Sequence, residues 1–355
     1  MKFSHYLTSY INSAKPLLDD FFEEQKNEAE KISPLAGEMI DYYRNFMEGG
    51  KMIRGMLTKL GYEIAGGKEE EKILWVSLYP EIIHSFLLIH DDIMDEDEIR
   101  RGKPTAHLYY AFLGRKKYHL KDASHYGLSM AIDLGDLGNY LAGEALLKSN
   151  FPPEKILALI KLANRIFLDT AFGQALDITG EAKKNWSKNY ILKIFLFKTA
   201  RYSVVGPLQF GAVLANANKK FLNAFKNYGE AVGIAFQIQD DILGMFGEEE
   251  IVGKDTGKRD IKEGKLTLLI EEAQKRASPE QKLFLKRVYG KRDISSKEVK
   301  EVKEIIINTG ALEYCQKYAQ KLVEKGKKFI PQITPLKDFQ EVLETFADFV
   351  IERKK

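Results

Sequence analysis

The amino-acid sequence predicts an all-α protein, and three observations carry that prediction. Apolar residues recur at helical spacing through most of the 355-residue chain. Runs of alternating β-branched residues, which mark strands, are nearly absent. Glycine and proline punctuation is sparse, and no low-complexity segment or long linker interrupts the pattern. We therefore expect one domain over residues 1–355, a single large helical bundle.

The first predicted helix carries an apolar stripe from Leu7 to Phe21, and Pro16 is expected to bend or interrupt it. The same periodicity predicts helices over later segments, namely 73–95, 128–148, 154–179, 189–213, 218–246, 264–276, 297–326 and 336–352. Some of these segments are apolar on most faces, so we expect them to be central.

Composition excludes several classes of protein. The net charge is only +3 and the cationic residues are dispersed, which argues against a nucleic-acid partner. The single cysteine, Cys315, allows no intrachain disulfide, as in a reducing compartment, and its apolar surroundings predict a small buried side chain. We expect no signal peptide, because the N-terminal segment has no continuous apolar run, and no uninterrupted apolar stretch approaches about 18 residues. The expected location is cytoplasmic, with no transmembrane segment.

An acidic cluster follows an apolar run at the end of the predicted helix 73–95. Asp91 and Asp95 are four residues apart and share a helical face, with Asp92 beside them. Carboxylates this close repel one another, and a hard divalent cation removes the conflict. The alternative is an acidic helix end leading into a loop. The twelve-residue calcium-binding loop is absent.

A second acidic pair, Asp240 and Asp241, also follows an apolar helical segment. Gln237 shares their face at helical spacing. Charged residues are rarely buried without a partner, and helix bundles build metal sites from carboxylates on facing helices. The two pairs together predict two helices that face each other across a central, metal-filled cavity.

Basic residues accompany both acidic segments. Lys51 and Arg54 follow Gly49-Gly50, Arg100-Arg101 follows the first cluster, Lys198 precedes Thr199, and a glycine-punctuated basic loop occupies 253–265. Cations together with metal-bridged oxyanions describe a diphosphate site. No Walker loop or GxGxxG is present, and the surroundings are apolar. The set predicts a substrate with a diphosphate head and a hydrocarbon tail, although each basic segment alone could be a solvated loop.

With these motifs in this order, the chain resembles the trans-type (all-E) isoprenyl diphosphate synthases over roughly residues 30–350, most closely the archaeal-type geranylgeranyl diphosphate synthases. The matching segments are Gly50-Lys51-Met52-Ile53-Arg54, Asp91-Asp92-Ile93-Met94-Asp95 with Arg100-Arg101-Gly102, Gly173-Gln174-Ala175-Leu176-Asp177, Lys198-Thr199-Ala200, Phe236-Gln237-Ile238-Gln239-Asp240-Asp241, and the loop with Lys254 and Lys265. The resemblance implies the isoprenoid synthase-like all-α fold and a homodimer.

The resemblance also assigns roles by position. Catalysis is assigned to Asp91, Asp92, Asp95, Lys198, Asp240 and Asp241, with Mg²⁺ ligated by Asp91, Asp95 and Asp240. The allylic diphosphate is assigned to Arg100, Lys198, Thr199, Gln237, Lys254 and Lys265, and isopentenyl diphosphate to Lys51, Arg54, His84 and Arg101. Gln174 and Asp177 would line the reaction centre. About three Mg²⁺ ions per site are implied, with Mn²⁺ as a substitute. A satisfied core histidine is the alternative at His84.

The implied reaction is ionisation of the allylic diphosphate, attack by the double bond of isopentenyl diphosphate, and proton loss. Phe86 and Leu87 would limit the chain length at the C20 geranylgeranyl product. Phe86, however, points about 140° from Asp91 on an ideal helix, so it could be ordinary core or a dimer contact. Gly244 replaces the third aspartate of the second motif, which excludes a metal ligand there.

Several alternatives stay open. They are a farnesyl or longer-chain synthase, a non-catalytic subunit of a heteromeric synthase, a terpene cyclase and a metal-storage bundle. A terpene cyclase usually has no second site for isopentenyl diphosphate, so Lys51 and Arg54 argue against that class. A metal-storage bundle would not need the basic residues near the acidic segments.

Overall fold

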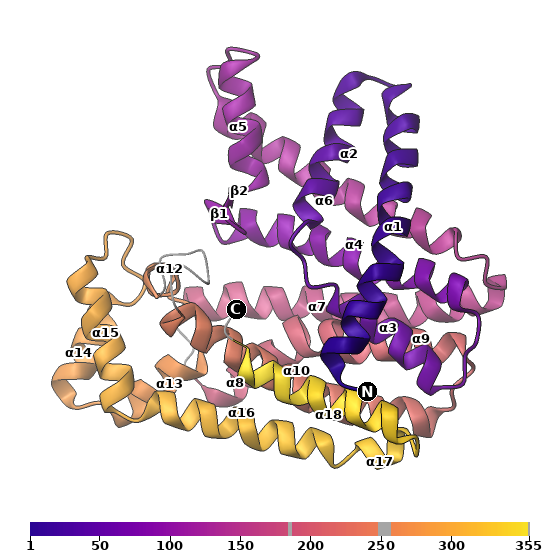
Figure 1. The fold of residues 1–355 in the computed structure, drawn as a ribbon. Helices are drawn as coiled ribbons and strands as arrows, with labels where there is room; N and C mark the ends of the chain where they lie inside the picture. Colours follow the sequence, from indigo (N-terminus) through magenta and orange to yellow (C-terminus); the bar gives the residue numbers. More distant parts are fainter. Residues whose placement is uncertain (184–186, 248–256, 354–355) are drawn as a thin grey trace. The chain divides into compact units, whose positions relative to one another are not determined.

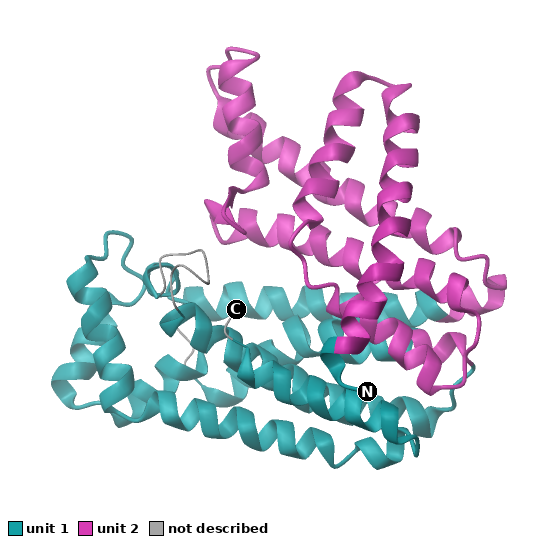
Figure 2. Ribbon diagram, in the orientation of Figure 1, with its two compact units in different colours: residues 1–4, 159–210, 216–355 teal, residues 5–158, 211–215 magenta. Residues whose placement is uncertain are grey.

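The computed structural model describes residues 1–183, 187–247 and 257–353. Within these ranges nearly every residue with regular structure is helical. The only strands there are two strands of two residues each, which pair as an antiparallel hairpin. The prediction of an all-α fold is therefore confirmed. The chain divides into two compact units (Figure 2). The expectation of a single domain over 1–355 stays a prediction.

Unit 2 comprises residues 5–158 and 211–215. Its elements are most of α1 (Phe3–Glu30), α2 (Pro34–Met47), α3 (Ile53–Ile64), α4 (Glu70–Met94), β1 (Ile99–Arg100), β2 (Lys103–Pro104), α5 (Ala106–Lys116) and α6 (Ala123–Leu147). Helix α4 is the centre of this unit, because α2, α3 and α6 all pack on it (Figure 1). Its buried residues include Ile73, Val76, Ile82 and Ile89.

Unit 1 comprises residues 1–4, 159–210 and 216–355. Its elements are most of α7 (Pro153–Lys183), then α8 (Lys188–Ile194), η1 (Phe195–Val205), most of α9 (Gly206–Leu214), α10 (Lys219–Phe246), α12 (Lys258–Glu263), α13 (Leu268–Arg276), α14 (Pro279–Val288), α15 (Ser296–Asn308), α16 (Ala311–Lys327), α17 (Ile330–Ile333) and α18 (Lys337–Glu352). Helix α10 is the centre of this unit, since η1, α16 and α18 pack on it. η1 is a π-helix.

Local sequence explains many helix starts. Ser278 and Ser295 each form a capping box with the residue three positions later, at the starts of α14 and α15. The side chains of Asn218 and Thr267 accept from the backbone at the starts of α10 and α13. These caps satisfy amide groups that a helix leaves without an internal partner.

The periodicity locates the long helices well, and three details differ. Pro16 does not interrupt α1, which runs from Phe3 to Glu30, and the alternative of a bend at Pro16 stays a prediction. The segment 297–326 is two helices, because Gly310 adopts a left-handed conformation (φ +71°) that separates α15 from α16. The segment 189–213 passes through α8, η1 and α9, so its middle is π-helical.

Helix α4 is long and apolar enough to cross a membrane by length and composition alone. Of its most apolar 18-residue window, 56% is buried inside the structure, and core helices of soluble proteins meet the same criteria. The absence of a transmembrane segment therefore stays a prediction.

Candidate active site

The first acidic cluster lies at the C-terminal end of α4. Asp91 and Asp92 belong to its last turn and Asp95 is the C-cap, whose N–H donates to the Asp91 carbonyl at 2.8 Å. The chain then turns into the β1–β2 hairpin, which carries Arg100. The predicted sharing of one helical face by Asp91 and Asp95 agrees with this backbone hydrogen bond.

Asp92 is fully buried and pairs with the guanidinium of Arg100. The Arg100 Nε donates to Asp92 Oδ1 at 2.5 Å, and its Nη2 donates to Asp97 Oδ2 at 3.3 Å. Burial raises the pKa of Asp92 to about 6, against the lowering effect of Arg100, and Asp97 raises it further. Asp92 Oδ2 is buried and accepts no hydrogen bond from the residues that the structure describes.

The basic residues assigned to isopentenyl diphosphate gather in unit 2. The guanidinium of Arg101 donates to the carbonyls of Phe46 (2.7 Å) and Glu48 (3.1 Å) and lies against Gly50. Burial lowers the pKa of His84 well below its usual value, and the positive charges of Arg54 and Arg101 lower it further. His84 is thus a neutral ring among cations, and Lys51 is next to Gly50 in the chain.

Glu81 supports this basic group from α4. It is buried, and its Oε1 accepts the N–H of Gly55 at 2.7 Å, in the first turn of α3. Burial raises the pKa of Glu81, although the nearby Arg54 lowers it. Glu81 therefore ties the segment that carries Lys51 and Arg54 to the helix that carries His84.

In unit 1, α7 and α10 both contact η1 near Lys198. The ammonium of Lys198 pairs with Asp177 Oδ2 of α7 at 2.7 Å. Thr199 Oγ1 donates to Gln237 Oε1 of α10 at 2.7 Å, and Gln237 Nε2 donates to Asp241 Oδ1 at 3.0 Å. The structure thus brings together five of the predicted site residues, and Gln174 lies on α7 three residues before Asp177.

Asp241 is the buried carboxylate of the second cluster. Burial raises its pKa to about 7; Lys265 lowers it, and Asp260 and Asp240 raise it further. The ammonium of Lys265 lies 3.4 Å from Asp241 Oδ1. Burial alone would lower the pKa of Lys265, but the surrounding carboxylates raise it well above its usual value, with Asp260 the strongest. Lys265 is therefore charged beside the second acidic pair.

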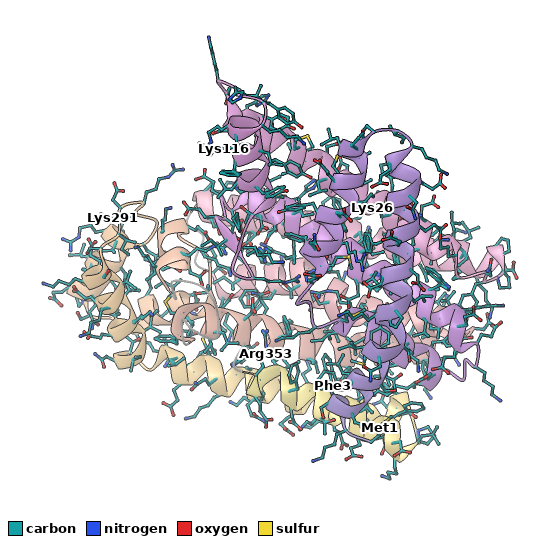
Figure 3. The ribbon with its side chains drawn as sticks, turned by 45° about the horizontal axis from the view of Figure 1, so that its top comes forward. Met1, Phe3, Lys26, Lys116, Lys291 and Arg353 are labelled. Carbon is teal, nitrogen blue, oxygen red and sulfur yellow. The ribbon has the colours of Figure 1, made fainter. Side chains whose placement is uncertain are left out.

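Asp240 is half exposed and pairs with the C-terminal Arg353, which is labelled in Figure 3. The Arg353 Nη2 donates to Asp240 Oδ1 at 3.1 Å and to the Phe236 carbonyl at 3.0 Å, and the guanidinium lies 3.9 Å above the Phe236 ring. The end of α18 therefore reaches the second acidic pair.

Gly244 gives room to a carboxylate from elsewhere in the chain. A Cβ at this position would lie 2.8 Å from Asp260 Oδ2. Asp260 is buried, and its Oδ2 accepts no hydrogen bond from the described part of the chain. A third aspartate at 244 would therefore require the carboxylate of Asp260 to shift.

The donor sets fit a hard divalent cation. Each acidic segment holds a buried carboxylate oxygen, Asp92 Oδ2 or Asp241 Oδ2, that accepts no hydrogen bond from residues in the described ranges. Oxygen ligands of this kind suit Mg²⁺, which keeps several waters and binds substrate phosphates as well. Among the described residues, no group of three or more His, Cys, Asp or Glu side chains could hold a metal by itself. Substrate oxygens would have to complete the ligand set.

The two residues predicted to limit the chain length, Phe86 and Leu87, lie just over one turn before the first acidic cluster on α4. The ring of Phe86 packs edge-on against His90 at 4.9 Å, and His90 Nε2 lies 3.1 Å from the Ile132 carbonyl of α6. Phe86 therefore lies on the face of α4 that packs on α6. Leu87 is half-buried. Lys254 lies outside the described residues.

Four residues near these clusters have no assigned role in the sequence prediction. They are Glu81, Asp97, Asp260 and Arg353. Asp97 could have been found, because it is acidic and three residues before Arg100. Asp260 lies within the glycine-punctuated loop 253–265, so its segment was predicted to belong to the site although no role was assigned to Asp260 itself. Glu81 and Arg353 reach the site through tertiary packing, for which the local sequence carries no signal.

Known proteins resemble this chain over most of its length. The family model described as polyprenyl synthetase matches residues 34–306. A short chain isoprenyl diphosphate synthase of Methanothermobacter thermautotrophicus is 34% identical over 86% of this chain and 87% of its own length. A geranylfarnesyl diphosphate synthase of Aeropyrum pernix is 30% identical over 86% of this chain and 91% of its own.

Solved structures show the same likeness. The crystal structure of a geranylgeranyl pyrophosphate synthase from Corynebacterium glutamicum, complexed with isoprenyl diphosphate and magnesium, superposes with a TM-score of 0.92 at 31% identity. The superposition covers 98% of this chain and 99% of that one. The chain therefore belongs to the polyprenyl synthetase family and is a trans-prenyltransferase.

Proposed function

We propose that this enzyme is a Mg²⁺-dependent synthase that condenses isopentenyl diphosphate with dimethylallyl, geranyl or farnesyl diphosphate, and that its main product is geranylgeranyl diphosphate. The observation that carries this proposal is the pairing of each acidic helix end with fixed cations, Arg100 beside Asp92 and Lys265 beside Asp241. Such groups suit the charge that develops on a departing diphosphate.

The roles follow from chemistry and position. Asp91, Asp95 and Asp240 are the proposed metal ligands, with Asp92 and Asp241 as buried support. The allylic diphosphate is proposed to contact Arg100, Lys198, Thr199, Gln237, Lys254 and Lys265. Isopentenyl diphosphate is proposed to bind Lys51, Arg54, His84 and Arg101, with Gln174 and Asp177 lining the reaction centre. A neutral His84 suits this role, because it can accept or donate a hydrogen bond without adding charge.

When bound, Mg²⁺ neutralises charge on the departing diphosphate. Lys198 and Arg100 hold that diphosphate in place while the allylic carbon–oxygen bond breaks. Arg54 and Arg101 hold isopentenyl diphosphate so that its double bond faces the allylic carbon. The surrounding apolar side chains exclude water, which would otherwise capture the allylic cation. No residue in the described ranges is assigned as the base, and the released diphosphate is the proposed proton acceptor.

We propose a cytoplasmic homodimer whose chains each act as one domain. Exposed apolar side chains on α6 (Leu128, Ile132, Tyr140, Leu147) and on α7 (Leu157, Leu168, Phe172) favour coverage by a second copy. About three Mg²⁺ ions per site, replaceable by Mn²⁺, complete the proposal.

The assay uses purified protein, Mg²⁺, isotopically labelled isopentenyl diphosphate and, separately, C5, C10 and C15 allylic diphosphates. We expect a Mg²⁺-dependent C20 alcohol after dephosphorylation. A C15 or a C25 product would keep the condensation and overturn the chain-length proposal. No incorporation by folded protein with any starter would instead favour a non-catalytic subunit.

Two substitutions on α4 test which side chain blocks the growing hydrocarbon tail, and the blocking residue is called the floor here. If Phe86 forms that floor, Phe86→Ala lengthens the main product by at least one C5 unit, because it removes the ring that blocks the tail. If Leu87 forms the floor, Leu87→Ala does so and Phe86→Ala does not. Product sizing by chromatography separates the two outcomes. Phe112→Ala on α5 is the matched control, since Phe112 is 53% exposed. Unchanged products from both α4 variants would show that the floor lies elsewhere.

A further inference from the structure

The π-helix η1 is an unusual element that needs support from its surroundings. It spans Phe195–Val205 and carries Lys198 and Thr199, and its i→i+5 pattern continues to Gly206, whose N–H donates to the Arg201 carbonyl. π-Helices account for well under 1% of residues and mostly form single turns at functional sites. An eleven-residue π-helix is therefore expected to depend on tertiary contacts for its register.

One set of contacts comes from α7. The buried carboxylate of Asp169 pairs through Oδ1 with Arg165 of the same helix and through Oδ2 with Arg201 of η1. Four residues later, Gly173 lies against the η1 backbone. A Cβ added at Gly173 would lie 2.3 Å from the backbone nitrogen of Lys198. Another four residues on, Asp177 pairs with the Lys198 ammonium. One face of α7 thus contacts η1 at three successive positions, Asp169, Gly173 and Asp177.

The other set comes from α10 and runs along a second stripe. Glu230 Oε1 lies 3.3 Å from the Arg201 Nε, and Gln237 Oε1 accepts from Thr199 at 2.7 Å. Between them, Gly233 lies against Ala200, where a Cβ would be 2.6 Å from the Ala200 Cα. The side of η1 that carries Thr199 is therefore tied to α10.

Arg201 joins the two sets. Its Nη1 pairs with Asp169 of α7, its Nε pairs with Glu230 of α10, and its guanidinium lies 4.6 Å from the ring of Phe197. A planar guanidinium can satisfy two carboxylates and stack on a ring at once, whereas an ammonium is a single point charge. Arg201 is thus suited to fix the position of η1 between the helices.

We propose that Arg201, held by Asp169 and Glu230, is a positioning residue that sets the π-helical register of Lys198 and Thr199. It touches neither substrate in the proposed function, on which this inference rests. A shift of about 1 Å in a group that holds a reacting molecule costs as much as 100-fold in rate. Loss of the Arg201 bridge is therefore expected to lower turnover through Lys198 and Thr199.

The test uses Arg201→Lys, which keeps the positive charge and removes the planar bridge. We expect kcat to fall about 10- to 100-fold, while KM for isopentenyl diphosphate changes less than about twofold. The matched control is Arg276→Lys in α13. Arg276 also pairs with a carboxylate, Glu272 at 3.0 Å, and lies 4.8 Å above the Tyr314 ring. Its expected loss of kcat is less than about twofold.

A second measurement separates positioning from general stability. In a Lys198→Ala, Thr199→Val background, Arg201→Lys is expected to cost at most about threefold, because groups that act as a unit are non-additive. The same loss in both backgrounds, or an equal loss in Arg276→Lys, would overturn the proposal. If Arg201→Lys does not fold, Glu230→Gln, which removes one carboxylate partner of Arg201, replaces it. Its loss of kcat is then compared with that of Arg276→Lys and between the two backgrounds. An inactive wild type would contradict the proposed function before any variant is compared.

Discussion

Asp91→Asn is expected to lower kcat about 10³-fold while the melting temperature changes by no more than about 2 °C. Asparagine keeps the shape of the side chain and removes the charge that makes aspartate a ligand for Mg²⁺. Asp91 lies in the last turn of α4, and its backbone carbonyl, which the substitution leaves in place, holds the N–H of Asp95. The loss should therefore appear in the chemical step and not in the fold.

Glu98→Gln is the control for this change. Glu98 is exposed, follows Asp91 by seven residues and has no proposed role. The amide substitution there should leave kcat within about twofold. Titration of activity with Mg²⁺ adds a second readout, in which Asp91→Asn should require more metal than the wild type. Retention of a tenth or more of the wild-type kcat by Asp91→Asn would contradict a metal-binding role.

The parts of the site that could be predicted are those with a local chemical signature. Asp91, Asp92 and Asp95 stand out because carboxylates at the end of an apolar helix conflict with burial. Gln237 and Asp241 stand out because helical spacing puts them on one face, and their side chains are hydrogen-bonded at 3.0 Å. The long helices were predictable for the same reason, since periodicity is a local property.

The rest depends on contacts between segments far apart in the sequence. Arg353 reaches Asp240 across 113 residues, and nothing near either residue indicates this pairing. Asp260 lies where Gly244 leaves space, so its position becomes visible only when α10 and α12 are both in place. The π-helical register of η1 was equally hidden, because its residues fit an α-helical pattern and tertiary contacts decide between the two.

Gly173→Ala is expected to have the second largest effect, a fall in kcat of about 100-fold. The new methyl group would lie 2.3 Å from the Lys198 nitrogen, 2.7 Å from the Phe197 carbonyl carbon and 2.8 Å from the Lys198 Cα. These are backbone atoms, so no side chain can move aside, and α7 and η1 must separate. Overpacking of this kind also costs about 1–3 kcal/mol of stability. Steady-state kinetics and thermal unfolding of the same preparation measure both effects.

Gly143→Ala in α6 is the matched control, because it makes the same change inside a helix. Gly143 follows Tyr140 of the proposed dimer face by three residues, so size-exclusion chromatography checks that the variant keeps the oligomeric state of the wild type. A Cβ at Gly143 would meet no atom of the described residues within 4 Å, and alanine is the better helix former by about 1 kcal/mol. This variant should keep its kcat and unfold at the wild-type temperature or slightly above it. Comparable kcat values for Gly173→Ala and Gly143→Ala would show that the close approach of α7 to η1 is not needed for turnover. A low kcat in Gly173→Ala at an unchanged melting temperature would place the effect on the position of Lys198, since general unfolding would lower both.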